Sequence, residues 1–143
     1  MATFRTYYMD NAVLDLSGVI ETAHAKLAGV DFDTIVGTGF SGGIAVPALA
    51  LAMEKKFLLI RKEGDDSHHS GRLVGELGLR WIFVDDLVST GRTRRRVMHQ
   101  VAGSLDWNET TTMVGQYLYQ RLDGVHEFEP FRTDWKLRGG DGK

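Results

Sequence analysis

Residues 81–93 read WIFVDDLVSTGRT, and this stretch decides the fold. We expect a strand at Arg80–Val84, because a continuous apolar run is typical of a strand buried on both faces of a parallel sheet. Two adjacent acids follow, then a turn of hydroxyl residues and glycine, and then a helix expected at about 92–104. A strand that leads through a polar turn into a helix is typical of an α/β protein.

The same alternation extends to both sides of this stretch. Apolar residues spaced three and four apart predict a helix before it, and short apolar runs predict further strands. The expected helices lie at 11–28 and 44–55, with Pro47 in the first turn of the second, and the expected strands at Thr34–Gly37, Phe57–Ile60 and Thr110–Leu118. Strands that alternate with helices form a mainly parallel, twisted sheet, whose ligands bind at the carboxyl ends of the strands.

Composition narrows the class of protein. A length of 143 residues suggests a single domain over 1–143, with a core at about 30–118. The chain has no cysteine, which excludes disulfides, thiolate metal sites and a cysteine nucleophile. A formal net charge of -2 argues against binding to nucleic acid or to an anionic membrane surface. The longest apolar run, Ile44–Met53, has ten residues, whereas a membrane span needs about 20, so we expect a cytoplasmic protein.

The turn after the expected strand suits a phosphorylated sugar. Backbone N–H groups and the hydroxyls of Ser89, Thr90 and Thr93 can surround a phosphate at the start of a helix, where the helix dipole is positive. Arginines at this end of a helix oppose the dipole, and a bound anion would remove that penalty. Asp85 and Asp86 repel phosphate but suit ribose hydroxyls and Mg²⁺. The alternative is an ordinary turn followed by a solvated arginine cluster.

Two further segments carry chemistry. Residues 37–43, GTGFSGG, contain four glycines, which let the backbone approach an anion closely, whereas a tight turn between strand and helix needs one or two. Residues 61–71, RKEGDDSHHSG, combine cations with imidazoles, and such a polar loop can close over a reactive centre to exclude water. The alternatives for this second segment are a solvated surface loop and a weakly indicated His-His-Asp metal site.

These three segments together resemble the type I phosphoribosyltransferases. Residues 84–93 resemble the family's motif for 5-phosphoribosyl 1-pyrophosphate (PRPP), residues 36–43 its pyrophosphate loop, and residues 61–63 the start of the catalytic loop of orotate phosphoribosyltransferases. Leu73-Val74-Gly75 also fits, so the resemblance covers about residues 30–105. It implies a Rossmann-like core, Mg²⁺ as cofactor, PRPP and a nucleobase as partners, and transfer of ribose 5-phosphate to the base with release of pyrophosphate. We further expect a homodimer.

The resemblance assigns a role to residues of each segment. Asp85 and Asp86 would hold the ribose hydroxyls and Mg²⁺, while Lys62, His68 and His69 would assist the departure of pyrophosphate. The family also holds a cis peptide in its pyrophosphate loop, which we expect here between Gly39 and Phe40. The 5′-phosphate would lie on Val88, Ser89, Thr90, Gly91, Arg92 and Thr93, and pyrophosphate on Thr38, Gly39, Phe40, Ser41, Gly42 and Arg61.

The nucleobase is indicated only indirectly. In this family a hood from outside the core covers the base, and residues 1–10 and 119–143 are the candidates here. Ser89 stands where hypoxanthine and guanine enzymes usually carry Asp, which favours orotate-like or adenine-like chemistry. Ser41 replaces a basic residue of many relatives, and acids at 65 and 66 stand where orotate enzymes place Lys. Ser41 and the acids favour the alternative function, a regulatory module that binds PRPP or a nucleotide with little turnover, whereas Arg61, Lys62 and the histidine pair favour the enzyme. A purely structural domain is a third interpretation.

Overall fold

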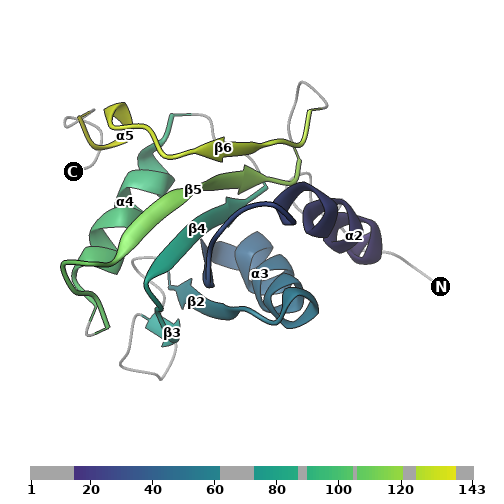
Figure 1. Cartoon of the computed structure of the whole chain (residues 1–143), viewed down its shortest axis with the longest axis horizontal. Helices are drawn as coiled ribbons and strands as arrows, with labels where there is room; N and C mark the ends of the chain where they lie inside the picture. Colours follow the sequence, from purple (N-terminus) through teal and green to yellow (C-terminus); the bar gives the residue numbers. More distant parts are fainter. Residues whose placement is uncertain (1–14, 62–72, 87–89, 105, 121–124, 138–143) are drawn as a thin grey trace.

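The computed structural model describes residues 15–61, 73–86, 90–104, 106–120 and 125–137 (Figure 1). Six strands form one sheet in the order β3-β2-β1-β4-β5-β6. The strands are β1 (Thr34–Thr38), β2 (Lys56–Ile60), β3 (Leu73–Gly75), β4 (Arg80–Asp85), β5 (Thr112–Leu118) and β6 (Phe128–Pro130). The four central strands are parallel, whereas the short edge strands β3 and β6 run antiparallel to their neighbours. The predicted mainly parallel α/β sheet is confirmed.

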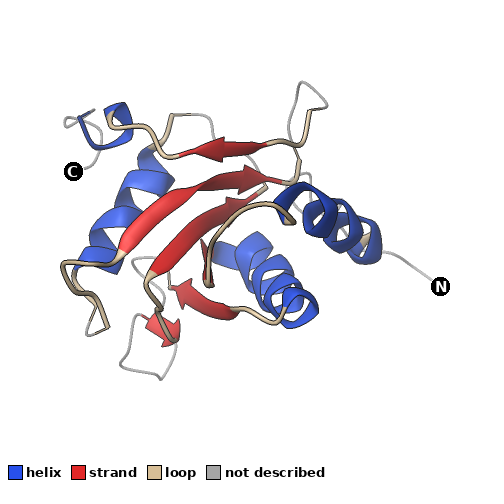
Figure 2. Cartoon of the chain, viewed as in Figure 1, coloured by secondary structure: helices blue, strands red, loops and turns tan. Residues whose placement is uncertain are grey.

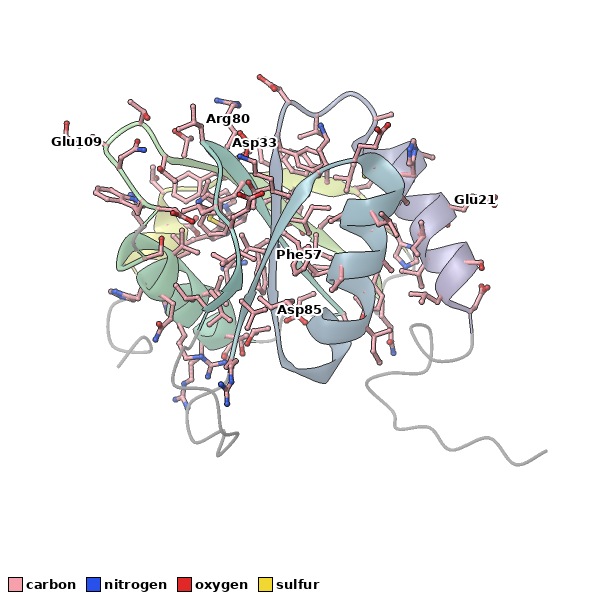
Figure 3. All side chains as sticks on the ribbon, turned by 90° about the horizontal axis from the view of Figure 1, so that it is seen from below. Glu21, Asp33, Phe57, Arg80, Asp85 and Glu109 are labelled. Carbon is pink, nitrogen blue, oxygen red and sulfur yellow. The ribbon has the colours of Figure 1, made fainter. Side chains whose placement is uncertain are left out.

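Helices cover both faces of this sheet (Figure 2). They are α2 (Leu16–Leu27), α3 (Gly39–Met53), α4 (Arg92–Ala102) and the short α5 (Asp134–Leu137). Successive residues of β1 point to opposite faces, so Ile35 packs in a core with residues of α2 and α3, and Val36 packs in a second core with residues of α4. Figure 3 shows α3 and α4 on opposite sides of the sheet.

Strands β1 and β4 are parallel neighbours, and the chain adds its next strand on opposite sides of this pair. From β1 the chain passes through α3 to β2 on one side, and from β4 it passes through α4 to β5 on the other side. In open α/β sheets, ligands bind outside the carboxyl ends of the strands at such a switch point. The fold therefore predicts a ligand site where β1 and β4 end.

At the other end of the sheet, where β1 and β4 begin, the carboxylate of Asp33 connects several strands by hydrogen bonds. Asp33 accepts hydrogen bonds from the Thr34 hydroxyl at 2.6 Å and from the N–H groups of Leu79 and Arg80 at 3.0 and 3.1 Å. Its carbonyl accepts a further hydrogen bond from the N–H of Lys56, so the residue connects β1 with the starts of β2 and β4. Burial alone would raise the pKa of Asp33, but these hydrogen bonds outweigh burial and hold the pKa below its usual range.

The largest correction concerns α3. The sequence pattern predicted a loop at 37–43 and a helix at 44–55 with Pro47 in its first turn, but the helix begins at Gly39 and Pro47 lies inside it. The chain turns out of β1 at Gly39, which has a φ of 75° that few residues other than glycine adopt. All peptide bonds between described residues are trans, so the expectation of a cis bond between Gly39 and Phe40 is wrong.

The other predicted elements are confirmed with shifted ends. The helix expected at 11–28 is α2, which the Asp15 carboxylate caps by accepting a hydrogen bond from the Gly18 N–H at 3.2 Å; residues 11–14 lie outside the described part of the chain. The helix expected at about 92–104 is α4. Strands β3 and β6 and helix α5 were not predicted. Among the helices described, none combines the length and apolar composition that a membrane crossing requires.

Candidate functional site

An acid pair stands at the carboxyl end of β4. Asp85 is the last residue of the strand, and it lies at the end of the sheet opposite to Asp33 and Arg80 (Figure 3). Asp85 and Asp86 are 8% and 7% exposed, and the N–H of Asp86 donates to Oδ1 of Asp85 at 2.9 Å. Their carbonyl groups accept hydrogen bonds from the N–H groups of residues 119 and 120, which continue β5. The backbone that carries both carboxylates is therefore fixed on one side by β5.

The helix that follows the acid pair has a glycine as its N-cap. Gly91 has a φ of 84° and no side chain that could cap α4. The hydroxyl of Thr90 accepts a hydrogen bond from the N–H of Arg92 at 3.2 Å. The first N–H groups of a helix have no partner within it, and together with the helix dipole they attract anions. Among the described residues, no side chain of the N-cap closes the start of α4, which lies at the end of the sheet that carries the acids.

A second helix starts at the end of the neighbouring strand β1. Thr38 is the N-cap of α3, but its hydroxyl donates to the Ile60 carbonyl of β2 and does not cap the helix. The glycines explain how the helix can begin so close to the strand: a Cβ at Gly37 would lie 2.6 Å from Cγ2 of Val46, and one at Gly42 would lie 3.2 Å from the backbone of Gly37. These two glycines therefore serve close packing, which the sequence pattern alone did not reveal.

Two helix starts and an acid pair consequently share one edge of the sheet. Strands β1 and β4 are hydrogen-bonded neighbours, and α3 and α4 leave their carboxyl ends on opposite faces. Arg61 follows β2 at the same edge. A ligand that matches this arrangement carries a negative group at each end and hydroxyl groups between them. The predicted residues that meet here are Thr38, Gly39, Gly42, Arg61, Asp85, Asp86, Thr90, Gly91, Arg92 and Thr93.

Other predicted site residues are not placed. Lys62, His68, His69, Val88 and Ser89 lie outside the described residues. The backbone of Phe40 and Ser41 belongs to the first turn of α3. The roles assigned to these residues remain predictions.

Four arginines begin α4, and the structure buries two of them. Arg94 and Arg95 are 8% and 3% exposed. A Cβ at Gly91 would lie 3.1 Å from Nη2 of Arg94 and 3.1 Å from Nη1 of Arg95, so both guanidinium groups turn back toward the start of the helix. The sequence signal was the run of arginines in a first turn, where they oppose the dipole. It indicated an anion but not that two of the side chains are buried.

The described part of the C-terminal segment, residues 125–137, packs beside β5. Phe128 packs against the core on the α2 and α3 face, and Phe131 meets Trp135 edge to face at 5.5 Å between ring centroids. Tyr119, at the end of β5, is buried in the core. The hood expected from residues 1–10 and 119–143 remains a prediction, since residues 1–14 lie outside the described part.

The acid pair suits a Mg²⁺ ion whose remaining ligands come from a substrate and water. No group of three or more His, Cys, Asp or Glu side chains that could hold a metal occurs among the described residues. Mg²⁺ is commonly held by one or two carboxylates together with substrate oxygens and water, unlike ions that need a complete protein cage. Asp85 and Asp86 provide two carboxylates at the edge of the sheet. The residues therefore fit a Mg²⁺ ion that arrives with a substrate.

Comparison with known proteins gives relatives for this arrangement. No family model matches the chain. An orotate phosphoribosyltransferase of Cellvibrio japonicus is 37% identical over 78 residues, which cover 50% of this chain and 36% of the relative. An orotate phosphoribosyltransferase of Archaeoglobus fulgidus is 31% identical over 91 residues, which cover 62% of this chain and 51% of the relative. The chain is thus similar in sequence to part of two orotate phosphoribosyltransferases.

The relationship has a limited extent. The chain spans about half or less of the length of these two curated phosphoribosyltransferases. Among solved structures, the UMP synthase of Leishmania donovani superimposes with a TM-score of 0.58 and 21% identity, over 72% of this chain and 21% of that one. A likeness at this identity concerns the fold alone. The phosphoribosyltransferase-like fold expected from the sequence is confirmed.

Proposed function

We propose that the chain binds PRPP across the switch point of the sheet and transfers its ribose 5-phosphate to a nucleobase, with release of pyrophosphate. The observation that carries the proposal is that two helices start at the ends of the adjacent strands β1 and β4, and that the acid pair stands at the end of β4. PRPP carries a phosphate on C5 and a pyrophosphate on C1 of one ribose, so its two anionic ends match the two helix starts. The names of the two curated relatives support the same class of reaction.

Each part of PRPP has a proposed partner. The 5′-phosphate lies on the turn at 88–93, where it accepts hydrogen bonds from backbone N–H groups and hydroxyls at the start of α4. Asp85 and Asp86 would bind the ribose hydroxyls and would hold Mg²⁺. The pyrophosphate lies on the first turn of α3, at 38–42, with Arg61 as a nearby cation.

The reaction breaks one bond at C1′ and forms another. A ring nitrogen of the base attacks C1′ and forms the new C–N bond as the bond from C1′ to the pyrophosphate oxygen breaks on the opposite side. The electron pair of the broken bond leaves with pyrophosphate, and the ring proton of the base passes to water. Negative charge therefore grows on the departing pyrophosphate, where Arg61, Lys62, His68 and His69 stabilise it. Mg²⁺, when held by the acid pair, supplies further neutralisation of that charge. The remaining work of the protein is positioning.

Orotate is the first base to test. Both curated relatives carry its name, and Ser89 stands where hypoxanthine and guanine enzymes usually carry an acid. Adenine is the second base to test, because Ser89 is compatible with adenine enzymes as well. We also propose a homodimer, which sedimentation velocity with and without PRPP tests directly.

The decisive binding experiment removes charge from the acid pair without changing its shape. PRPP affinity is measured by calorimetry with Mg²⁺ for the parent and for Asp85→Asn combined with Asp86→Asn; we expect the affinity to fall by more than about tenfold, as the loss of charge-assisted hydrogen bonds implies. The matched control is Asp31→Asn combined with Glu109→Gln, which removes two exposed carboxylates at the other end of the sheet. Equal affinity in the parent and the acid-pair variant would overturn the proposal.

A turnover experiment separates the enzyme from the binding module. Pyrophosphate release is followed with PRPP, Mg²⁺ and each of orotate, uracil, adenine, hypoxanthine and guanine. We expect release with orotate or adenine. If PRPP binds through the acid pair but no base gives pyrophosphate, the function is the alternative, a PRPP- or nucleotide-binding regulatory module.

A further inference from the structure

The start of α4 carries a buried cation that phosphate binding alone does not explain. Arg94 is 8% exposed, and it stands in the first turn of the helix, where a positive charge is unfavourable. Burial of a charge is costly unless other groups hold it. The contacts of Arg94 therefore show which part of the protein stabilises this charge beside the turn at 88–93.

Its partners come from β5 and from the C-terminal segment. Nη1 of Arg94 donates to Oε1 of Gln116 at 2.9 Å, and Nε2 of Gln116 donates to Oε1 of Glu129 at 3.1 Å. The guanidinium carbon of Arg94 lies 4.2 Å from the ring centroid of Trp135, which is 4% exposed. A guanidinium stacked on an indole is attracted to the face of the ring. Phe131 in turn holds the Trp135 ring edge to face.

Electrostatics point to the same segment. Burial and the neighbouring charge of Arg95 lower the pKa of Arg94, whereas the carboxylates of Glu129 and Asp134 act in the opposite direction. Both carboxylates belong to the C-terminal segment. That segment therefore places a stacking ring and two carboxylates beside this buried arginine, although its Arg132 acts in the same direction as Arg95.

The same guanidinium also lies close to Gly91, the N-cap of α4. Nη2 of Arg94 is 3.1 Å from the position that a Cβ on Gly91 would occupy, so the group lies directly against the N-cap of α4. Any other residue at 91 would meet both the guanidinium and an unfavourable φ of 84°. Arg94 thus lies between the turn and the C-terminal segment and contacts elements on both sides.

We propose that the C-terminal segment positions Arg94, with Trp135 and Gln116 holding its guanidinium against Gly91, so that binding of a phosphomonoester at the start of α4 depends on residues outside the parallel sheet. Arg94 is a positioning residue for the turn, and Trp135 acts through it. The inference rests on the proposed 5′-phosphate site. The inference goes beyond that site because it assigns a binding role to Trp135, an aromatic residue that contacts Arg94.

The test compares two anions that are expected to bind at different helix starts. Affinities for ribose 5-phosphate and for inorganic pyrophosphate are measured by calorimetry for the parent and for Trp135→Leu, Trp135→Phe and Lys136→Ala. We expect Trp135→Leu to weaken ribose 5-phosphate by about tenfold, and Trp135→Phe, which keeps an aromatic face, to restore most of the loss. Lys136→Ala is the matched control, because Lys136 is exposed and lies over Phe131. Pyrophosphate affinity should stay at the parent value throughout.

A second readout is the fluorescence of Trp135 itself. Ribose 5-phosphate should change the emission of the parent but not that of Trp135→Phe, and Arg94→Lys should reduce the change, because lysine cannot both stack on Trp135 and bond Gln116. An unchanged affinity for ribose 5-phosphate in Trp135→Leu overturns the inference alone, and an equal loss for both anions overturns it in favour of general structural damage. If the parent binds neither ribose 5-phosphate nor PRPP, the proposed function fails as well.

Discussion

Replacing Gly37 by alanine should destabilise the protein and displace the start of α3. A Cβ at this position would lie 2.6 Å from Cγ2 of Val46 and 3.1 Å from the Val84 carbonyl, so Val46 would have to withdraw by about 0.8 Å to reach the 3.4 Å of ordinary contact. Val46 is fully buried and β-branched, and it has little freedom to move. Extra atoms in a packed core typically cost about 1–3 kcal/mol. We expect a loss of that size in the free energy of unfolding.

The assay is urea unfolding, with thermal unfolding as a second measure. A loss of 1 kcal/mol lowers Tm by about 4 °C in a domain of this size, and pyrophosphate affinity should fall as well, because the first turn of α3 moves. Gly43→Ala is the matched control: a Cβ there meets nothing within 4 Å, and alanine is favoured over glycine in a helix by about 1 kcal/mol. The two substitutions should therefore change stability in opposite directions. A Gly37→Ala protein as stable as the parent would refute the packing argument.

Three further predictions concern other parts of the chain. Because the folded pKa of Asp33 lies below the usual 3.8, its contribution to stability is present above that pH and lost as pH falls below it; Asp33→Asn should lower stability at pH 7 and reduce the loss on acidification, measured by urea unfolding. Gly115→Ala should detach β6, since its Cβ would lie 2.2 Å from a carbonyl of that strand, and limited proteolysis should then cut the C-terminal segment. Replacing Lys62, His68 and His69 together by alanine should cut turnover by about tenfold or more with little change in PRPP affinity, and turnover at the parent rate would exclude the loop from the chemistry.

The parallel sheet and the acid pair could be predicted from sequence because their signals are local. An apolar run such as Trp81–Val84 has few alternatives to a buried strand, and Asp85 and Asp86 follow it directly. The start of α3 could not be predicted in the same way. The contact between Gly37 and Val46 joins a strand to a later helical turn, and no local pattern distinguishes glycines that permit such packing from glycines of a loop.

The strand and the helix of the C-terminal segment could not be predicted for a related reason. Strand β6 has three residues and α5 has four, which is too short for a hydrophobic period to be visible. The burial of Arg94 depends on Trp135 and Gln116, which lie far from it in the sequence. A first helical turn rich in arginine therefore predicts an exposed surface when only the local sequence is considered. The contacts that polar residues make with residues distant in the sequence could therefore not be predicted from local sequence patterns.

The short antiparallel strands at the two edges of the sheet bear on how the protein behaves at high concentration. A long, flat edge strand exposes a row of unpaired N–H and C=O groups that can recruit another chain into a growing intermolecular sheet. In the described part of the chain each edge strand has three residues; β6 ends in Pro130, which has no N–H to donate, and β3 ends in Gly75, which has a φ of 117°. The two edge strands thus expose few unpaired N–H and C=O groups to which a second sheet could hydrogen-bond. The folded protein should therefore resist fibrillar aggregation, and its association should use the helical faces.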